Sequence, residues 1–259
     1  MLRTVVIERD EIKKACNALL EAWREVRIVL MRASWLAPGE VREFYDLLLP
    51  RVGTPLRLAE DVRVGDRATQ RTGEIWMEVR FDPAFKDAYR HSLNAQPLHT
   101  DGSYIREFPN ASLMCCVQNA AMGGETTFLR AETLVELLRE EAPALLSDLE
   151  RIPMPHSRSG DHRVHPVIRY EPDGVHLNWN YYCVSQEATP EALDVRERFF
   201  QFLQNSPALQ AALLPVKLMT GDAVAWKDEL VLHGRNAFKA GEASERFLWK
   251  CAIDIGVFS

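Results

Sequence analysis

Two histidines and one aspartate carry the strongest chemical signal in this sequence. His99 and Asp101 are separated by one residue, and His233 follows 132 residues after Asp101, directly behind the apolar run Leu230-Val231-Leu232. Two imidazoles and one carboxylate are the ligand set of non-haem Fe(II) oxygenases, where they fill one face of the metal and leave positions open for chemistry. On a strand, residues i and i+2 share a face about 6.5–7 Å apart. His99 and Asp101 could therefore reach one ion.

Each of these residues also has a plainer interpretation. A His-x-Asp pair arises often by chance and would then be a pair of side chains in a surface turn. A lone histidine at the end of a strand, such as His233, would be held by a backbone hydrogen bond. Further matches are needed to favour the metal site.

An arginine within an apolar strand pattern supplies one such match. Arg246 lies 13 residues after His233 and is followed by Phe247-Leu248-Trp249. A guanidinium inside a sheet needs an anion, and the distal carboxylate of 2-oxoglutarate suits its bidentate geometry. Thr126, which follows Gly123-Gly124, could donate a hydrogen bond to the same carboxylate. The alternatives are an arginine in a surface salt bridge and an ordinary glycine loop.

The elements that must position these residues indicate a mainly β fold with flanking helices. In the first 100 residues, positions 10–25 have helical spacing, 27–33 predict a buried strand, and Pro38-Gly39-Glu40 opens a helix that Gly53 and Pro55 end. Residues 58–98 are predicted to be irregular.

After residue 100 the pattern changes to short apolar or alternating runs. Strands are predicted at 113–117, 167–170, 175–179, 216–219, 223–226 and 247–253. Helices are predicted around 134–139 and 145–149, and beginning at Thr189-Pro190 and Ser206-Pro207. Regular strand–helix alternation is missing, so an antiparallel sandwich or barrel braced on one side is favoured over a doubly wound sheet.

Four segments resemble one known family. The strings PLHTDGSY, GGETTF, GDAVAWKDELVLHGRNAF and ERFLWK are similar, in order and approximate spacing, to the taurine dioxygenase/clavaminate synthase-like family of Fe(II)- and 2-oxoglutarate-dependent oxygenases. The earlier stretch VRIVLMRASWLAPGEVREFYDLLLPRVGTPL is similar to the N-terminal part of that family. The resemblance spans about residue 25 to residue 253.

The resemblance implies a fold and a site. It implies a double-stranded β-helix (jelly-roll, cupin-like) core in a single domain of residues 1–259. Residues 1–90 would brace a core of residues 91–259, and helical insertions would lie at 131–151 and 189–214. It implies His99, Asp101 and His233 as iron ligands and Thr126 and Arg246 as contacts of 2-oxoglutarate.

The implied reaction consumes O₂ and 2-oxoglutarate, releases succinate and CO₂, and hydroxylates an unactivated C–H bond of a small metabolite. Two alternatives stay open. The same cofactors could desaturate, epoxidise or cyclise a substrate in natural-product biosynthesis, or the chain could be a jelly-roll binding protein without turnover.

Lys250 is the leading candidate for a substrate contact. It stands four residues after Arg246, so the two share a face of one strand. The taurine-oxidising member of the family has an arginine at the matching position, which holds the anionic group of its substrate. We therefore expect an anionic or amino-acid-like substrate on Lys250, with a solvated lysine as the alternative. Further pocket contacts are expected from Gln96, Tyr104, Arg106, Arg158 and Asn178.

A second histidine cluster lies between residues 153 and 166. His156, His162 and His165 could suggest another metal, but no carboxylate or cysteine completes the set convincingly, so loop histidines are favoured. The same loop could be a lid over the pocket.

Composition limits the classes of partner. The 259 residues are 47% apolar and carry a formal net charge of −6. A general nucleic-acid binder would have a basic excess, so nucleic acid is not expected as a partner. No apolar run approaches the ~20 residues of a membrane span. The sequence leaves open whether the protein forms a homo-oligomer. The N-terminus does not resemble a secretory signal, and five cysteines without a framework pattern predict a cytoplasmic protein with reduced thiols.

Overall fold

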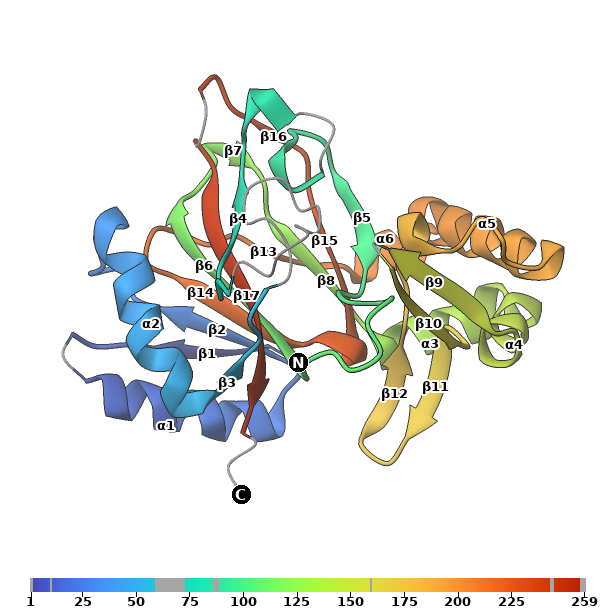
Figure 1. Ribbon diagram of the computed structural model, residues 1–259, viewed down its shortest axis with the longest axis horizontal. Helices are drawn as coiled ribbons and strands as arrows, with labels where there is room; N and C mark the ends of the chain where they lie inside the picture. The colour runs from blue at the N-terminus through green and yellow to red at the C-terminus, as the bar shows by residue number, and fades with distance from the viewer. Residues whose placement is uncertain are drawn as a thin grey trace.

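The computed structural model describes residues 2–9, 11–58, 73–85, 89–158, 160–242 and 245–256. In this part of the chain, two β-sheets pack against each other and helices lie on the outside (Figure 1). The prediction of a mainly β fold with flanking helices is confirmed.

The larger sheet contains the N-terminal and C-terminal strands. Its seven strands run in the order β1-β2-β14-β6-β17-β3, and β4 also pairs with β17. Their bounds are β1 Leu2–Val6, β2 Ile28–Arg32, β3 Gly53–Pro55, β4 Met77–Arg80, β6 Ala111–Gln118, β14 Ala223–Lys227 and β17 Phe247–Ile255. Only β1 and β2 are parallel.

The smaller sheet is antiparallel and has the order β13-β8-β15-β5. Its strands are β5 Gln96–His99, β8 Thr126–Arg130, β13 Leu214–Val216 and β15 Val231–Arg235. A short ribbon joins β7 Met122–Gly123 to β16 Phe238–Lys239. One apolar cluster fills the space between the two sheets, because it combines residues of the larger sheet with Phe128 and Val231 of the smaller sheet.

Two helices cover the outer face of the larger sheet. They are α1 Ile12–Glu25 and α2 Val41–Val52, the latter preceded by the short helix η1 Pro38–Glu40. The predicted stripe of α1 is buried at Ala15, Leu19 and Trp23, which pack in one cluster with α2 and the sheet. Both helices were predicted from their spacing, and both are confirmed.

A third layer of helices and hairpins lies beside the smaller sheet (right in Figure 1). Its helices are α3 Ala131–Glu141, α4 Pro143–Arg151, α5 Pro190–Asn205 and α6 Pro207–Ala212, and its hairpins pair β9 Met154–Arg158 with β10 Asp161–His165 and β11 Ile168–Glu171 with β12 Gly174–Leu177. The side chains of Thr189 and Ser206 accept hydrogen bonds from the first turns of α5 and α6. The predicted caps are therefore confirmed.

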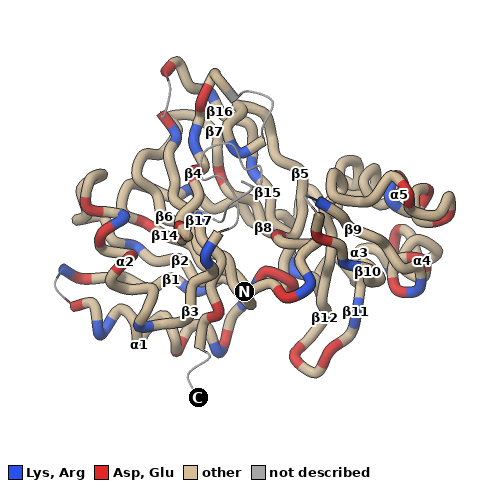
Figure 2. Tube along the Cα trace, viewed as in Figure 1, with Lys and Arg blue, Asp and Glu red and all other residues tan. Residues whose placement is uncertain are grey.

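The remaining short helices are η2 Pro83–Phe85, η3 Tyr89–His91, η4 Tyr181–Cys183 and η5 Asp228–Leu230. Among the described residues, no helix has the length and apolar character needed to cross a membrane. All five cysteines are buried as free thiols, and Cys115 and Cys116 pack within β6. Basic and acidic residues are interspersed along the described trace (Figure 2).

Several expectations about local structure were wrong. The segment 58–98, predicted to be irregular, contains β4 and β5 in its described parts, while residues 59–72 and 86–88 lie outside the described residues. The strand expected at 216–219 ends at Val216. The loop expected at 153–166 is the β9–β10 hairpin. These strands are short and polar, and pairing with distant segments stabilises them where local alternation is weak.

Candidate active site

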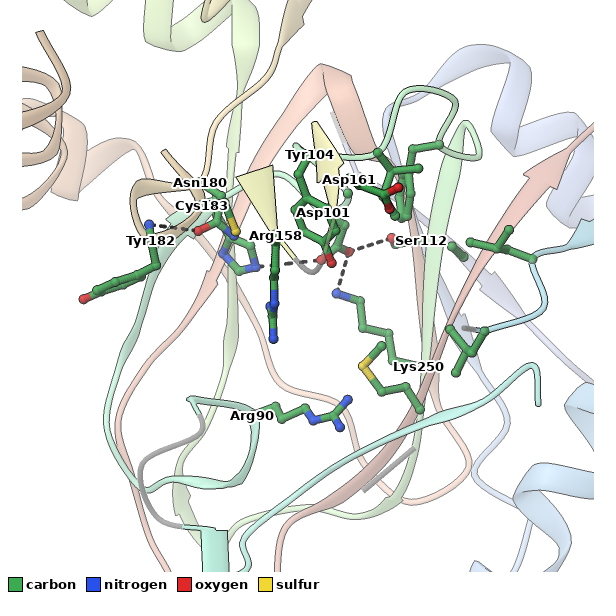
Figure 3. Close-up of a pocket in the computed structure, with 18 of the residues that line it drawn as sticks. Arg90, Asp101, Tyr104, Ser112, Arg158, Asp161, Asn180, Tyr182, Cys183 and Lys250 are labelled. Atoms are coloured by element: carbon green, nitrogen blue, oxygen red, sulfur yellow. Dashed lines mark hydrogen bonds and ion pairs between the residues drawn. The ribbon is translucent and has the colours of Figure 1, made fainter. Parts of the chain in front are cut away.

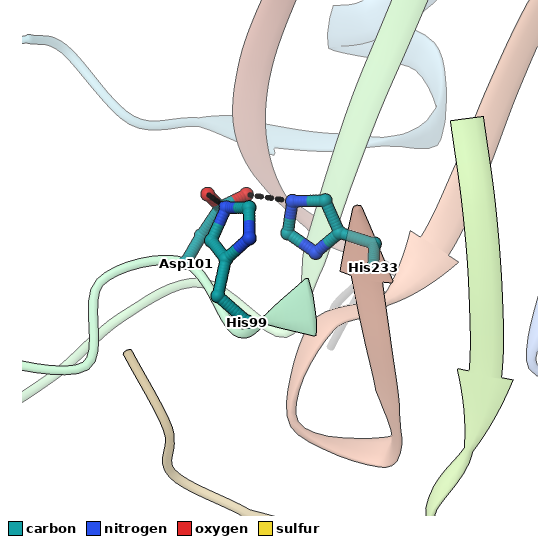
Figure 4. A group of neighbouring side chains, drawn as sticks. All are labelled: His99, Asp101 and His233. Atoms are coloured by element: carbon teal, nitrogen blue, oxygen red, sulfur yellow. Dashed lines mark ion pairs between the residues drawn. The ribbon is translucent and has the colours of Figure 1, made fainter. Parts of the chain in front are cut away.

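His99, Asp101 and His233 come together at one point of the smaller sheet (Figure 4). His99 on β5 lies directly opposite His233 on β15, with ring centroids 4.2 Å apart. Nε2 of His99 is 3.8 Å from Oδ1 of Asp101, and Nε2 of His233 is 3.7 Å from Oδ2 of Asp101. One ligand atom of each residue lies within 4.8 Å of the others, so the trio could hold a single metal ion.

The position of Asp101 differs from the expectation that it shares a strand with His99. β5 ends at His99, and Asp101 lies in the turn that follows. Gly102 has a φ of +54° in this turn, and a Cβ there would come within 2.2 Å of the Phe108 ring. The two ligands thus converge through a tight turn rather than through the alternation of a strand.

The electrostatics of the trio favour ligand binding. Burial raises the pKa of the Asp101 carboxyl, but Lys250, His233 and His99 outweigh burial and hold that pKa well below its usual range. Burial lowers the pKa of both histidines. Neutral imidazoles beside an ionised carboxylate are the forms that bind a metal.

Asp101 has two further contacts from the larger sheet. Nζ of Lys250 lies 2.5 Å from Oδ2 of Asp101, and the Ser112 hydroxyl donates to the same oxygen at 2.8 Å (Figure 3). Lys250, predicted as a substrate contact, forms an ion pair with Asp101 of the trio.

His99 and Asp101 line a cavity of about 850 Å³. Five of the six expected pocket residues line it: Gln96, Tyr104, Arg106, Arg158 and Lys250. Asn178 is the exception and corrects that expectation, because it is buried and its amide lies 3.2 Å from Nδ1 of His156. Asn180, two residues later, lines the cavity.

Thr126 and Arg246 both line a second, much smaller cavity. Nε of Arg246 donates to the Gly124 carbonyl at 3.3 Å, whereas its buried Nη1 has no hydrogen bond within the described part of the chain. Burial lowers the pKa of Arg246 to about 10. A buried cation with an unused donor needs an anion, so this corner could bind the distal carboxylate of 2-oxoglutarate.

The glycine pair beside Arg246 has a steric cause. Gly123 and Gly124 both have a φ of +75°. A Cβ on Gly123 would come within 2.1 Å of the Ala237 carbonyl oxygen, and one on Gly124 within 3.0 Å of Arg246 Nε. The backbone therefore lies so close to Ala237 and to the Arg246 side chain that only glycine fits at these two positions.

The second histidine cluster forms no metal site in the described residues, where His99, Asp101 and His233 are the only group with suitable geometry. His156 is fully buried, and its Nδ1 lies 3.2 Å from the Met154 carbonyl oxygen. Burial lowers its pKa to about 4. It is a neutral core histidine on β9, whereas a loop histidine was expected.

Other residues around the site were missed in the sequence. They are Arg90, Ser112, Asp228 and Arg235. Arg235 faces Thr126 in the pairing of β15 with β8, and its Nη2 donates to the carbonyl oxygens of Tyr89, Ser92 and Asn94. Its place two residues after His233, on the same face of the strand, was the available signal. No sequence pattern indicated Arg90 or Ser112, because each reaches the site from a separate element.

Comparison with known proteins adds a family assignment. Residues 8–252 match the model of the family described as taurine catabolism dioxygenase TauD, TfdA family. Dioxygenase str8 of Strobilurus tenacellus is 29% identical over 205 residues, which cover 73% of this chain and 47% of that protein. Uridine-5'-phosphate dioxygenase of a Streptomyces species is 30% identical over 172 residues, covering 61% of each. The chain spans less than two thirds of the length of either relative.

Among solved structures, the non-haem iron oxygenase OrfP with bound Fe and alpha-ketoglutaric acid has a TM-score of 0.67 and 14% identity, covering 94% of this chain and 80% of OrfP. Another OrfP structure contains Fe, succinate and (3S)-hydroxy-L-Arg. At this identity the likeness is one of fold. The family model extends over nearly the whole chain, and the protein therefore belongs to the TauD/TfdA dioxygenase family.

Proposed function

We propose that this protein is an Fe(II)- and 2-oxoglutarate-dependent oxygenase that hydroxylates a small anionic metabolite. One observation carries the proposal: two histidines and an aspartate converge on one point, and two of the three, His99 and Asp101, line a large cavity. Family membership and the fold of OrfP support it. His99, Asp101 and His233 would be the metal ligands, within a single jelly-roll domain of the kind the family resemblance implies.

The residues present fit the cosubstrate. Arg246 and Thr126 would bind the distal carboxylate of 2-oxoglutarate, since Arg246 has a buried donor without a hydrogen bond in the described chain. The iron, 2-oxoglutarate and O₂ together supply the oxidising power for C–H hydroxylation, with succinate and CO₂ as the other products. The protein supplies orientation: β5 and β15 fix the metal side, and Arg246 fixes the far end of the cosubstrate.

The cavity supports an anionic substrate. Its basic lining residues reach it from separate elements, with Lys250 on β17, Arg158 on β9 and Arg90 on η3, and their side chains extend toward one space in Figure 3. Tyr104 lines the same wall, with its ring under the Arg158 guanidinium at 6.0 Å. A carboxylate or phosphate beside Lys250 and Arg158 would place the neighbouring carbon atoms near the metal trio. Uridine-5'-phosphate dioxygenase, by its name, acts on such an anion.

Anaerobic addition of Fe(II) and then 2-oxoglutarate to the purified apoprotein tests the proposal. We expect a weak visible charge-transfer band that needs both additions and is lost in His99→Ala. Succinate release in the presence of candidate anions would then identify substrates. A folded protein that gives no band would refute the assignment and favour a non-catalytic binding protein.

A further inference from the structure

Asp228 is a fully buried carboxylate whose contacts all surround the metal-binding trio. It begins η5, the short helix between β14 and β15, and none of its surface is exposed. Burying a carboxylate is costly unless hydrogen bonds compensate it. The groups that compensate Asp228 therefore indicate what it does.

The first of these groups is the main chain of Asp101. Oδ2 of Asp228 accepts the Asp101 N–H at 2.9 Å. The ladder between β5 and β15 ends at the His99–His233 pair, so strand pairing does not hold Asp101. The bond to Asp228 and the hydrogen bonds between Thr100 and Trp179 together anchor the turn that presents the Asp101 carboxylate.

The second group is the outer nitrogen of His233. Oδ1 of Asp228 lies 4.0 Å from Nδ1 of His233, and this buried nitrogen has no hydrogen bond within the described residues. The opposite nitrogen, Nε2, faces Asp101. In His99 the equivalent outer nitrogen lies 2.8 Å from the Pro97 carbonyl oxygen. Each histidine thus has an oxygen on its outer side and the trio on its inner side.

The third group fixes Asp228 itself. The Trp226 indole N–H donates to Oδ1 of Asp228 at 3.1 Å, and the Trp226 ring lies 4.7 Å from the His233 ring. The Asp228 N–H donates to the Asn110 carbonyl at 3.2 Å. The carboxylate is consequently held from both ends and cannot turn away from the two ligands.

We propose that Asp228 is a positioning residue that orients two of the three metal ligands, the Asp101 turn and the His233 ring. Metal-bound histidines usually donate their outer N–H to a carboxylate or carbonyl, which fixes the tautomer and makes the ligand more basic. The Pro97 carbonyl supplies this acceptor for His99, and Asp228, now 4.0 Å from Nδ1 of His233, would supply it for His233 once a metal fixes the ring. The inference rests on the proposed function, because it requires the trio to bind a metal.

Zn(II) is a suitable probe, because it accepts the same nitrogen and oxygen ligands and is diamagnetic. Its affinity for the apoprotein is measured by competition with a chelating dye, without turnover. We expect Asp228→Ala to weaken Zn(II) binding by about 10- to 100-fold, as for other residues behind metal ligands. Asp228→Asn, which keeps the size and one acceptor oxygen, should give a smaller loss.

The matched control is Asp222→Ala. Asp222 is also a buried aspartate that accepts a main-chain N–H, from Met219 at 2.9 Å, but it lies at the far end of β14 and contacts none of the trio. We expect this variant to lose thermal stability and to keep the Zn(II) affinity of the wild type. The contrast separates metal positioning from general damage to the fold.

A second measurement follows the His233 ring directly. In the Zn(II)-loaded wild type, nitrogen-resolved NMR should detect a slowly exchanging Nδ1–H on His233, and this signal should disappear in Asp228→Ala. If folded Asp228 variants keep the wild-type Zn(II) affinity and an unchanged His233 signal, the positioning role of Asp228 is refuted, while the proposed function is unaffected. A wild-type protein that binds no Zn(II) would overturn the proposed function as well.

Discussion

Arg246 offers the sharpest test of how the cosubstrate is held. Its guanidinium is buried, uses Nε on the Gly124 carbonyl, and has an Nη1 with no hydrogen bond in the described chain. A hydrogen bond to a charged group contributes about 1.5–3 kcal/mol. A pair of such bonds to one carboxylate would supply at least ~3 kcal/mol, which corresponds to about 100-fold in Kd. We therefore expect Arg246→Met to weaken 2-oxoglutarate binding by about two orders of magnitude.

The assay compares two ligands in the same variant. 2-Oxoglutarate and 2-oxopentanoate share the end that binds the metal, but only 2-oxoglutarate has the distal carboxylate. Titration of the anaerobic Fe(II) complex should show Arg246→Met losing its preference for 2-oxoglutarate while its affinity for 2-oxopentanoate is unchanged. Arg163→Met removes another buried arginine, one that pairs with Glu229, and should keep the preference. An equal loss for both ligands in Arg246→Met would refute the reasoning, since it would mean that Arg246 only maintains the fold.

Three further outcomes are expected. Lys250→Ala should raise the KM for the substrate by about tenfold or more, because it removes a hydrogen bond to a charged group. The Kd of 2-oxoglutarate should stay unchanged. An unchanged KM would exclude Lys250 as a substrate contact. Gly124→Ala should cost about 1–2 kcal/mol in a urea melt because φ is +75°, and it should weaken 2-oxoglutarate by displacing Arg246; wild-type values in both would contradict the steric argument. His156 has a pKa of about 4 when folded and about 6.5 when unfolded, so its contribution to stability is complete above pH 6.5 and falls as the pH drops toward 4. The loss is about 3 kcal/mol, and unfolding curves of His156→Gln should show a flatter dependence over this range.

The sequence was most informative where structure is set locally. The helices that start at Pro190 and Pro207 follow Thr189 and Ser206, whose side chains cap the helix beside them. Such caps need no information from elsewhere in the chain. The stripe of α1 was equally visible, because its buried face repeats with the helical period.

Strands that depend on distant pairing were harder to predict. β9 and β10 read MPHSR and DHRVH, with little apolar alternation, and they form a hairpin whose residues 158 and 161 face each other. The trio shows the same limit. Its residue types were visible in the sequence, but the convergence of His99 and His233 depends on a strand register that joins segments more than 130 residues apart. Asp228 was not identified from the sequence for the same reason, because its proposed role depends on its hydrogen bond to Asp101, which lies 127 residues away.

The proposed metal ligands and the proposed substrate contacts come from different elements of the fold. The proposed metal ligands come from β5, its following turn and β15, which lock each other through the His99–His233 pair. Other parts of the cavity wall come from other elements: β17 with Lys250, and the β9–β10 hairpin with Arg158. The hairpin carries no proposed ligand, so its cavity-lining residue Arg158 can change without altering the ligands, whereas Arg163 on the same hairpin pairs with Glu229 beside Asp228. Selection for a new substrate would therefore act first on Arg158 and on Lys250, while Asp228, which begins the short helix before β15 and binds the turn of Asp101, would be held constant by the metal.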